Sequence, residues 1–270
     1  MDFGDVSKRG LVLLGCGKMG GAMLEGWLAG GLDPASLHVI DPVPSDWLKS
    51  QGVSLNGALP AAPAVLVVAV KPQIMDAALP QVATFGDRDT VVLSIAAGTT
   101  IARLENAFGT GTPVIRAIPN TPAAVGKGIT ALIGNAHVTE MQMTQAEALL
   151  SAVGKTVRLS DESQMDAVTA LSGSGPAYVF HLIETMAAAG VTQGLPAELA
   201  LKLALTTVSG AGALAEASPE HPAELRVNVT SPNGTTQAAL EVLMDENSGF
   251  PSLLNRAIKA AADRSRELGK

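Results

Sequence analysis

The sequence has little of several features that would narrow its chemistry at once. Only one cysteine, Cys16, occurs among 270 residues, so no disulfide can form within the chain, and this usage is typical of a reducing compartment. Lys and Arg number 18 against 25 Asp and Glu, and the net charge of −7 argues against a nucleic-acid partner. Four scattered histidines offer no zinc-ligand spacing. We therefore expect no metal site.

Long apolar runs and hydrolase motifs are also missing. The apolar run over residues 65–70 is far too short to cross a bilayer, and the first residues have no signal-peptide pattern. No G-x-S-x-G elbow is present, and no Walker lysine follows a glycine-rich loop. We expect a soluble cytoplasmic protein without a membrane partner.

The composition is that of a well-buried globular protein. Hydrophobic residues make up 47% of the chain, charged residues 16% and aromatic residues only 3%, so the core is expected to consist of Ala, Val, Leu and Ile. The length allows one large domain or two ordinary ones.

The strongest motif lies near the start of the chain. An apolar run over residues 11–14 predicts a buried strand, and Gly15, Gly17 and Gly20 then form a G-x-G-x-x-G pattern that leads into a helix over residues 22–28. The glycines allow a sharp turn, a close approach of the backbone to a pyrophosphate, and tight packing of helix on strand. The helix N-terminus then faces the phosphates. In this context the motif predicts dinucleotide binding.

Strand and helix patterns alternate over the first part of the chain. Strands are predicted at residues 37–41, 65–70, 90–95, 113–118, 129–133 and 156–159, with a helix over 139–153. This alternation is typical of a doubly wound sheet, whose ligands bind at the carboxyl ends of the strands. We expect Gly15, Asp41, Lys71, Ala97 and Asn120 on that edge.

The second part of the chain has helical patterns with clear breaks. Helices are predicted at residues 177–189, 197–217, 235–246 and 251–268. Several are apolar around most of their circumference, which predicts burial against another subunit. The fold class expected is α/β, with a Rossmann-like mostly parallel sheet domain (1–160) followed by an all-α substrate-binding and dimerisation domain (161–270).

Asp41 ends the second predicted strand, 21 residues after Gly20. At about that spacing, roughly 20 residues, an acidic side chain hydrogen-bonds the adenosine ribose in dinucleotide folds. Asp41 equally suits a cap for the turn that begins at Pro42, and the sequence leaves both interpretations open. If Asp41 meets the ribose, its charge repels a 2′-phosphate, which weakly favours NADH over NADPH.

Two loops in the second part are unusual for connectors. Residues 171–178 place the only tyrosine, Tyr178, beside a turn of small residues, and residues 228–236 put hydroxyl groups at a helix start. Ordinary helix capping explains both loops, since Ser, Thr and Asn are the preferred caps. Helix N-termini also bind carboxylates, which makes a substrate site the alternative.

Five segments together resemble one enzyme family. They are Gly15-Cys-Gly-Lys-Met-Gly20, Ala69-Val-Lys-Pro72, Arg116-Ala-Ile-Pro-Asn-Thr-Pro122, Leu171-Ser-Gly-Ser-Gly-Pro-Ala-Tyr178 and Ser231-Pro-Asn-Gly-Thr-Thr236. In this order they resemble pyrroline-5-carboxylate reductase, which reduces a cyclic imine to proline with NADPH or NADH. The first segment is common to dinucleotide folds, whereas the last two are quite specific. The resemblance implies the last step of proline biosynthesis and favours a substrate site at both loops.

The resemblance also implies roles for individual residues. Cofactor-binding residues on the phosphate and ribose side would be Gly15, Cys16, Gly17, Lys18, Met19, Gly20, Asp41 and Asn56. The nicotinamide side would be lined by Ala69, Val70, Lys71, Pro72, Ala96, Ala97 and Asn120. Substrate-binding residues would be Glu162, Asn228, Gly234, Thr235 and Thr236. Of these, Asn228 and the backbone of Gly234 and Thr235 would receive the carboxylate, and Thr236, the one catalytic residue, would hydrogen-bond the ring nitrogen.

The chain departs from the family pattern at three positions. Asn233 stands where a glycine is usual, and we expect the loop geometry to survive because Asn tolerates positive φ. Ile118 replaces the more frequent Met near the nicotinamide. Asp41 stands where many members have a small polar or basic residue, so the cofactor preference does not follow from the resemblance.

Imine reduction needs little acid–base machinery, since the protonated imine is already electrophilic, and Thr236 is expected to orient the nitrogen. One alternative is a β-hydroxyacid dehydrogenase, which would need a lysine base such as Lys202 or Lys259. Another is a dinucleotide-binding regulator without turnover, which would have no use for a carboxylate pocket.

We interpret Cys16 as a space-filler and expect a homodimer or larger homo-oligomer through the C-terminal helices.

Overall fold

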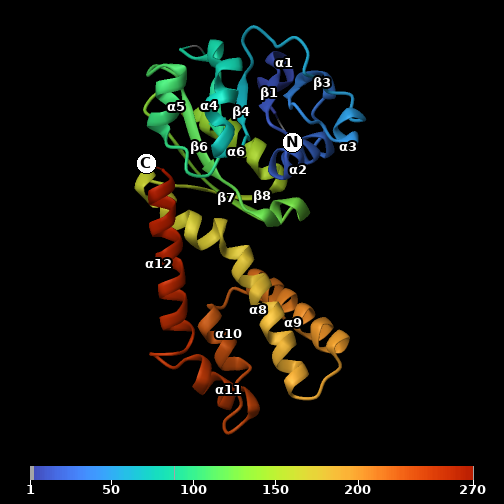
Figure 1. The fold of residues 1–270 in the computed structure, drawn as a ribbon, viewed down its shortest axis with the longest axis vertical. Helices are drawn as coiled ribbons and strands as arrows, with labels where there is room; N and C mark the ends of the chain where they lie inside the picture. The colour runs from blue at the N-terminus through green and yellow to red at the C-terminus, as the bar shows by residue number, and fades with distance from the viewer. Residues whose placement is uncertain (1–2, 88, 270) are drawn as a thin grey trace. The chain divides into compact units, whose positions relative to one another are not determined.

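The first part of the chain forms an eight-stranded sheet (Figure 1). The computed structural model describes residues 3–87 and 89–269. The strands are β1 Leu11–Leu14, β2 Leu37–Ile40, β3 Ser54–Leu55, β4 Val65–Val68, β5 Val91–Ser94, β6 Val114–Ile118, β7 Gly128–Gly134 and β8 Gly154–Arg158. They lie in the order β3-β2-β1-β4-β5-β6-β7-β8. Pairing is parallel from β3 to β6, β7 is antiparallel to β6, and β8 is parallel to β7. The predicted Rossmann-like, mostly parallel sheet is confirmed.

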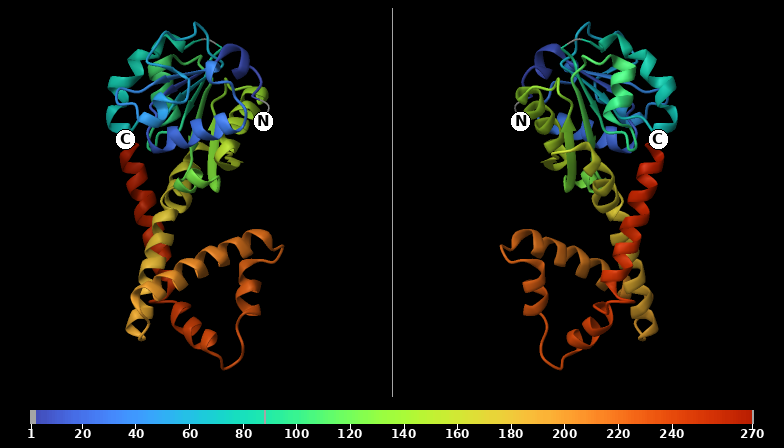
Figure 2. Two further views of the ribbon diagram at one scale, coloured as in Figure 1. Left: turned by 90° about the vertical axis from the view of Figure 1, so that its right-hand side faces the viewer. Right: turned by 90° about the vertical axis from the view of Figure 1, so that its left-hand side faces the viewer.

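Helices cover both faces of this sheet (Figure 2). Those before residue 173 are α1 Val6–Arg9, α2 Lys18–Ala29, α3 Asp46–Lys49, α4 Met75–Ala78, α5 Ile101–Phe108, α6 Glu140–Leu150 and α7 Met165–Val168. Alternate strand residues point to opposite faces. Side chains such as Leu11 and Leu13 therefore pack with α1, α2 and α6, whereas Val12 and Leu14 pack with α4 and α5.

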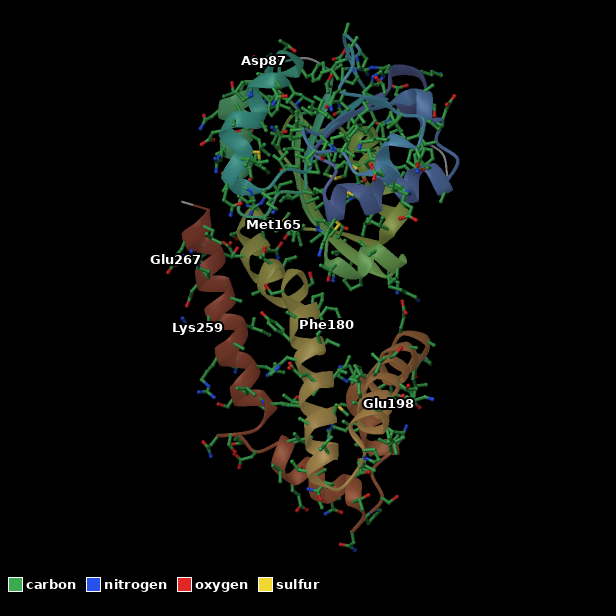
Figure 3. All side chains as sticks on the ribbon, turned by 45° about the vertical axis from the view of Figure 1, so that its right-hand side comes forward. Asp87, Met165, Phe180, Glu198, Lys259 and Glu267 are labelled. Atoms are coloured by element: carbon green, nitrogen blue, oxygen red, sulfur yellow. The ribbon has the colours of Figure 1, made fainter. Side chains whose placement is uncertain are left out.

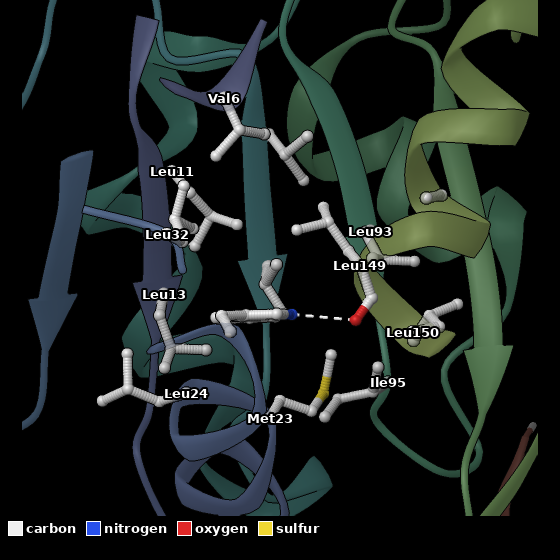
Figure 4. Packing of buried hydrophobic residues seen from close by; sticks show 14 of the residues in the cluster. Val6, Leu11, Leu13, Met23, Leu24, Leu32, Leu93, Ile95, Leu149 and Leu150 are labelled. Carbon is white, nitrogen blue, oxygen red and sulfur yellow. Dashed lines mark hydrogen bonds between the residues drawn. The ribbon is translucent and has the colours of Figure 1, made fainter. Parts of the chain in front are cut away.

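Trp27 lies at the centre of the core on the α2 face. Its side chain is fully buried, and its indole Nε1 donates a hydrogen bond of 2.8 Å to the carbonyl oxygen of Leu149, in the last turn of α6 (Figure 4). Met23 and Leu24, on the same helix, are also fully buried. The hydrogen bond satisfies the one polar atom of the tryptophan and joins helices 122 residues apart in sequence.

The second part of the chain is helical throughout. Its helices are α8 Gly175–Thr192, α9 Ala197–Ala217, α10 Pro222–Asn228, α11 Thr235–Leu243 and α12 Phe250–Leu268. Helices α8 and α9 pack on each other through small residues (Figure 1). Ala187, Ala200 and Ala204 are buried there, and a β-carbon at Gly190 would lie 3.2 Å from Ala200 Cβ.

Large apolar side chains of these helices remain exposed in the single chain. Phe180 of α8, labelled in Figure 3, is 64% exposed. On α9 the exposed side chains are Leu199, Leu201, Leu203, Leu205 and Leu214. By length and composition α9 would suffice to cross a membrane, and 11% of its most apolar window is buried. It is the one such helix among the described residues.

The chain divides into two units whose limits differ from the predicted domains. The first consists of Met1–Gly173 together with Ala262–Lys270, and the second of Ser174–Ala261. The predicted boundary after residue 160 therefore lies inside the first unit. The reason is packing: Met165 and Ala170 are fully buried, and Ser265 Oγ donates a 2.6 Å hydrogen bond to Asp166 Oδ1.

Local structure differs from the sequence prediction at several places. The sequence did not predict the two-residue strand β3 or the helices α1, α3, α4, α5, α7 and α10. In place of the turn of small residues expected within 171–178, the structure has a π-helical turn, Thr169–Gly173, that runs into α8 with Ser174 still near helical φ and ψ. Gly and Pro destabilise a helix only slightly when they stand at its start. The sequence therefore suggests a break at a place where the helical backbone in fact continues.

We expect Trp27→Phe to lower the free energy of unfolding by about 1–3 kcal/mol, because the carbonyl of Leu149 loses its buried donor. Urea denaturation followed by circular dichroism measures the change. The matched control is Trp47→Phe on α3, whose side chain is exposed and should change stability by less than about 0.5 kcal/mol. Equal effects of the two substitutions would contradict the role given to the hydrogen bond.

Candidate cofactor and substrate site

The turn after β1 is built on two of its glycines. Gly15 adopts a φ of +90°, and a β-carbon there would lie 2.9 Å from Val70 Cγ1. A β-carbon at Gly20 would lie 2.5 Å from the carbonyl oxygen of Gly15, closer than real side chains approach. Glycine is therefore required at both positions, for the sharp turn and for the close packing of α2.

Gly17 and the first turn of α2 are open to a ligand. A β-carbon built on Gly17 would meet no atom within 4 Å beyond its chain neighbours. Gly17 is the N-cap of α2, no side chain caps the helix, and its first turn has no acidic residue. The unpaired N–H groups and the positive end of the helix dipole suit a pyrophosphate, and exposed Lys18 adds positive charge.

Asp41 ties this turn to the end of β2. Its Oδ2 accepts a 2.7 Å hydrogen bond from the N–H of Cys16, and its Oδ1 accepts one of 2.8 Å from the N–H of Val43. Asn56, at φ +50°, binds the backbone N–H and carbonyl of Asp41 with its side-chain amide. The turn-capping interpretation of Asp41 is therefore seen in the structure, and a contact with the ribose stays a prediction.

Cys16 is half-buried beside Asp41, and its side chain packs against the core. Burial, with a smaller contribution from the charge of Asp41, raises the pKa of the Cys16 thiol to about 11. The thiol is consequently protonated near neutral pH and a weak nucleophile. This agrees with the interpretation of Cys16 as a space-filler.

The other predicted cofactor residues follow strands of the same sheet. Because β1 to β6 are parallel, the residues after them lie along one edge. Asn56 follows β3, Ala69, Val70, Lys71 and Pro72 follow β4, Ala96 and Ala97 follow β5, and Asn120 follows β6. Lys71 and Ala97 are exposed on this edge, whereas the side chains of Val70 and Ala96 are buried. Met19 is half-buried against the core. A ligand would therefore contact Val70, Ala96 and Met19 chiefly through their backbone atoms.

Asn120 links three segments of the first unit. Its Nδ2 donates to the carbonyl of Ser172 at 3.2 Å, and its Oδ1 accepts from the N–H of Ile129 at 2.9 Å. Gly173 lies against Ile118 of β6, where an added β-carbon would be 3.6 Å from Ile118 Cγ2. The structure thus brings together the third and fourth of the family-like segments, and the buried Asn120 side chain is occupied by protein partners.

Glu162 is held by partners inside the first unit. Its Oε1 accepts a hydrogen bond of 2.7 Å from Arg116 Nη1 and one of 2.9 Å from the N–H of Ile101. Arg116 lies in β6 and is 5% exposed. These contacts do not test the predicted role of Glu162 in substrate binding. They show that its carboxylate also binds Arg116 and the start of α5.

The predicted substrate loop lies in the second unit, between α10 and α11. Asn233 has a φ of +59°, so the expectation that Asn tolerates this backbone angle is confirmed. Thr235 begins α11 without a side-chain cap, which leaves N–H groups for an anion. The N–H of Gly234, however, donates to the carbonyl of Ser231 at 3.0 Å.

Asn228 is the last residue of α10, and its Nδ2 donates to Glu220 Oε2 at 3.1 Å. Thr236 is half-buried in the first turn of α11. The cofactor residues and Glu162 thus belong to the first unit, and Asn228, Gly234, Thr235 and Thr236 to the second.

Sequence reasoning missed the part played by Arg116, Ile101 and the pair Asp166–Ser265. The available signal was an arginine in an otherwise apolar strand, Val-Ile-Arg-Ala-Ile, since a buried guanidinium requires an acidic partner. Among the described residues, no group of three His, Cys, Asp or Glu side chains is placed to hold a metal ion.

Family models match both parts of the chain. One described as "Pyrroline-5-carboxylate reductase dimerisation" matches residues 162–268, and one described as "NADP oxidoreductase coenzyme F420-dependent" matches residues 10–98. The pyrroline-5-carboxylate reductase of Pseudomonas aeruginosa is 42% identical over 266 residues, covering 96% of this chain and 97% of the relative. That of Synechocystis sp. is 48% identical over 206 residues, covering 76% and 75%.

Solved structures of pyrroline-5-carboxylate reductases have the same fold as this chain. A pyrroline-5-carboxylate reductase from Coxiella burnetii superposes with a TM-score of 0.90 at 33% identity, covering 97% of this chain and 99% of that one. The Plasmodium falciparum pyrroline carboxylate reductase with NADP bound gives a TM-score of 0.84 at 28% identity, covering 98% and 99%. The chain therefore belongs to the pyrroline-5-carboxylate reductase family.

Proposed function

We propose that this chain reduces 1-pyrroline-5-carboxylate to L-proline with a hydride from NADPH or NADH. Family membership over almost the whole chain supports the reaction. The observation that carries it for this chain is the glycine turn, where the space at Gly17 and the uncapped start of α2 suit a dinucleotide pyrophosphate. A relative of known structure contains NADP, in agreement with this cofactor class.

The residues of the chain have binding and orienting tasks in this reaction. A bound nicotinamide supplies the hydride to C5 of the ring, and the protonated ring nitrogen keeps its proton and becomes the secondary amine. We propose that the carboxylate is received by the start of α11, chiefly by the N–H of Thr235, because Gly234 donates elsewhere. Thr236 accepts a hydrogen bond from the ring nitrogen and fixes its orientation. Asn228 adds a donor once it leaves Glu220.

A β-hydroxyacid dehydrogenase fits the chain less well. Oxidation of an alcohol requires a base near the hydroxyl group. Lys202 and Lys259, the two candidates, are exposed side chains in the middle of α9 and α12.

We also propose a homodimer or larger homo-oligomer, formed through the C-terminal helices, that works in the cytoplasm. The exposed leucines of α9 require cover, and a helix with Glu198 and Lys202 among them suits a protein partner better than lipid. The family model for residues 162–268 is described as a dimerisation region, which supports a second copy as the cover.

The reaction is tested by following NADPH oxidation with 1-pyrroline-5-carboxylate, and NAD(P)+ reduction with 3-hydroxyacids in parallel. We expect turnover with the imine alone. Thr236→Ala should lower kcat about 10- to 100-fold through loss of one hydrogen bond to a charged group, with the KM for NADPH unchanged. Thr235→Ala is the matched control, because it keeps the backbone N–H and should retain most activity. An unchanged kcat for Thr236→Ala would remove this residue from the mechanism.

The cofactor preference is tested at Asp41. If its carboxylate lies near the ribose, NADH should give the higher kcat/KM, and Asp41→Asn should raise the NADPH-to-NADH ratio about tenfold by removing a charge that repels the 2′-phosphate. Asn retains an acceptor for the N–H of Cys16, whereas Asp41→Ala loses it and separates the loss of charge from the loss of the turn. A strong preference of the unmodified protein for NADPH would refute the ribose role.

Cys16 reports on the phosphate turn, since it is the chain's single thiol. With a pKa of about 11, about one thiol in a thousand is ionised at pH 8, so alkylation by iodoacetamide should be slow and should rise tenfold per pH unit up to about pH 10. Saturating NADPH should slow it further, and urea should restore the rate of an ordinary cysteine. A rate that levels off below pH 9 would contradict the raised pKa.

A further inference from the structure

Glu162 is presented from a rigid turn. It begins the 3-10 turn Glu162–Gln164, whose N-cap Asp161 accepts from the N–H of Ser163 at 2.8 Å. The side chain of Gln164 accepts in return from the N–H groups of Ser160 and Asp161. The turn is thus closed in both directions, which fixes the backbone from which Glu162 extends, and its carboxylate is held by Arg116 and Ile101.

The carboxylate neutralises a buried charge in the sheet. Arg116 pairs with Ser94, the last residue of β5, in the strand register, and Glu162 is the ion-pair partner of Arg116 among the described residues. Arg116 Nε is buried without a hydrogen-bond partner there. A buried guanidinium without its carboxylate would have to draw in water or move, so this strand end depends on Glu162.

The same oxygen caps helix α5. Ile101 is the first residue of α5, and its N–H points to Glu162 Oε1, while the N-cap Thr100 accepts from Arg103. The first turn of α5 has no acidic residue of its own, so Glu162 supplies the negative charge that the start of a helix favours. One carboxylate thus contacts both the arginine that lies opposite Ser94 in the strand register and the first N–H of α5 at Ile101, on either side of residues 95–100.

The segment between these two contacts, residues 95–100, contains part of the predicted nicotinamide side of the cofactor site. Ala96 and Ala97 lie in it, and Thr99 is fully buried with a hydroxyl that has no partner in the part of the chain described. On its other side, a β-carbon at Gly98 would lie 3.5 Å from the carbonyl oxygen of Leu268 in the last turn of α12. Hydrogen bonds from Ile95 to Val68 and from Thr99 to Ala96 hold its first part, and Glu162 and the last turn of α12 add contacts at its far part.

We infer that Glu162 is a positioning residue for the nicotinamide side of the site: through Arg116 and the first N–H of α5 it holds the β5–α5 segment, residues 95–100, in the shape that receives the cofactor. The inference rests on the proposed function only in naming the reaction whose kinetic constants the test measures. It assigns Glu162 to the cofactor rather than to the substrate.

The test separates these two assignments by KM and kcat. Glu162→Gln keeps an acceptor for Ile101 but leaves Arg116 without a counter-charge, and Glu162→Ala removes both. We expect the Kd and KM for NADPH to rise about threefold to tenfold in the first and more in the second, with kcat lowered and the KM for 1-pyrroline-5-carboxylate changed less than about twofold. Arg116→Lys should act in the same direction and carries the test if Glu162→Ala does not fold.

The matched control is Glu147→Gln on α6, which weakens the exposed ion pair of Glu147 with Arg158. It should leave all kinetic constants unchanged. A raised KM for the imine with an unchanged Kd for NADPH in the Glu162 variants would show that Glu162 binds substrate and overturn the inference. So would a lowered Tm with every kinetic constant intact. The Kd for NADPH, measured by its fluorescence without substrate, keeps the result independent of the proposed reaction.

Discussion

The approach of α2 to β1 at Gly20 is the contact on which the cofactor edge depends. With only a hydrogen at this position, the helix lies against the carbonyl of Gly15, and the N–H of Cys16 then reaches the carboxylate of Asp41. This joins the ends of β1 and β2, and the backbone of Ala69 joins β4 to them through the carbonyl of Leu14. A larger residue would move the helix start away from the place where its N–H groups are useful.

The segment 95–100 of the predicted nicotinamide side is held in a different way. Its supports come from segments remote in sequence: the turn at Glu162 and the last turn of α12. The predicted phosphate side therefore depends first on the glycines of one local motif, whereas residues 95–100 of the predicted nicotinamide side depend on partners far away in sequence. A charged group in the core, Arg116, makes the second arrangement specific, because it accepts few neighbours other than a carboxylate.

The contrast explains how much of the structure the sequence could predict. Runs such as Val65–Val68 and the glycine pattern follow from local periodicity and backbone freedom, and the sheet class followed from them. The sequence did not predict helix α5, because the helix is short and its N-terminus is capped partly by Glu162, 61 residues away. The predicted role of Asn120 on the cofactor edge did not include its bond to Ser172, which only the fold brings near.

The domain boundary shows the same limit. A change from valine-rich strands to helical patterns correctly marks where the sheet ends near residue 160, but residues 161–173 pack on the sheet all the same. Composition reports the kind of secondary structure, whereas the unit to which a helix belongs depends on which of its faces is buried. Met165, Asp166 and Ala170 decide that here.

The return of the chain to its first unit has a consequence for synthesis. The turns that carry Ser265 and Leu268 are made after the whole second unit, and both contact parts of the first unit. While the chain grows from the ribosome, the sheet can assemble early, but Asp166 and the segment around Gly98 lack these partners until the second unit has been synthesised. The part of the predicted nicotinamide side around Gly98 thus gains its last contacts only after all of the second unit has been made.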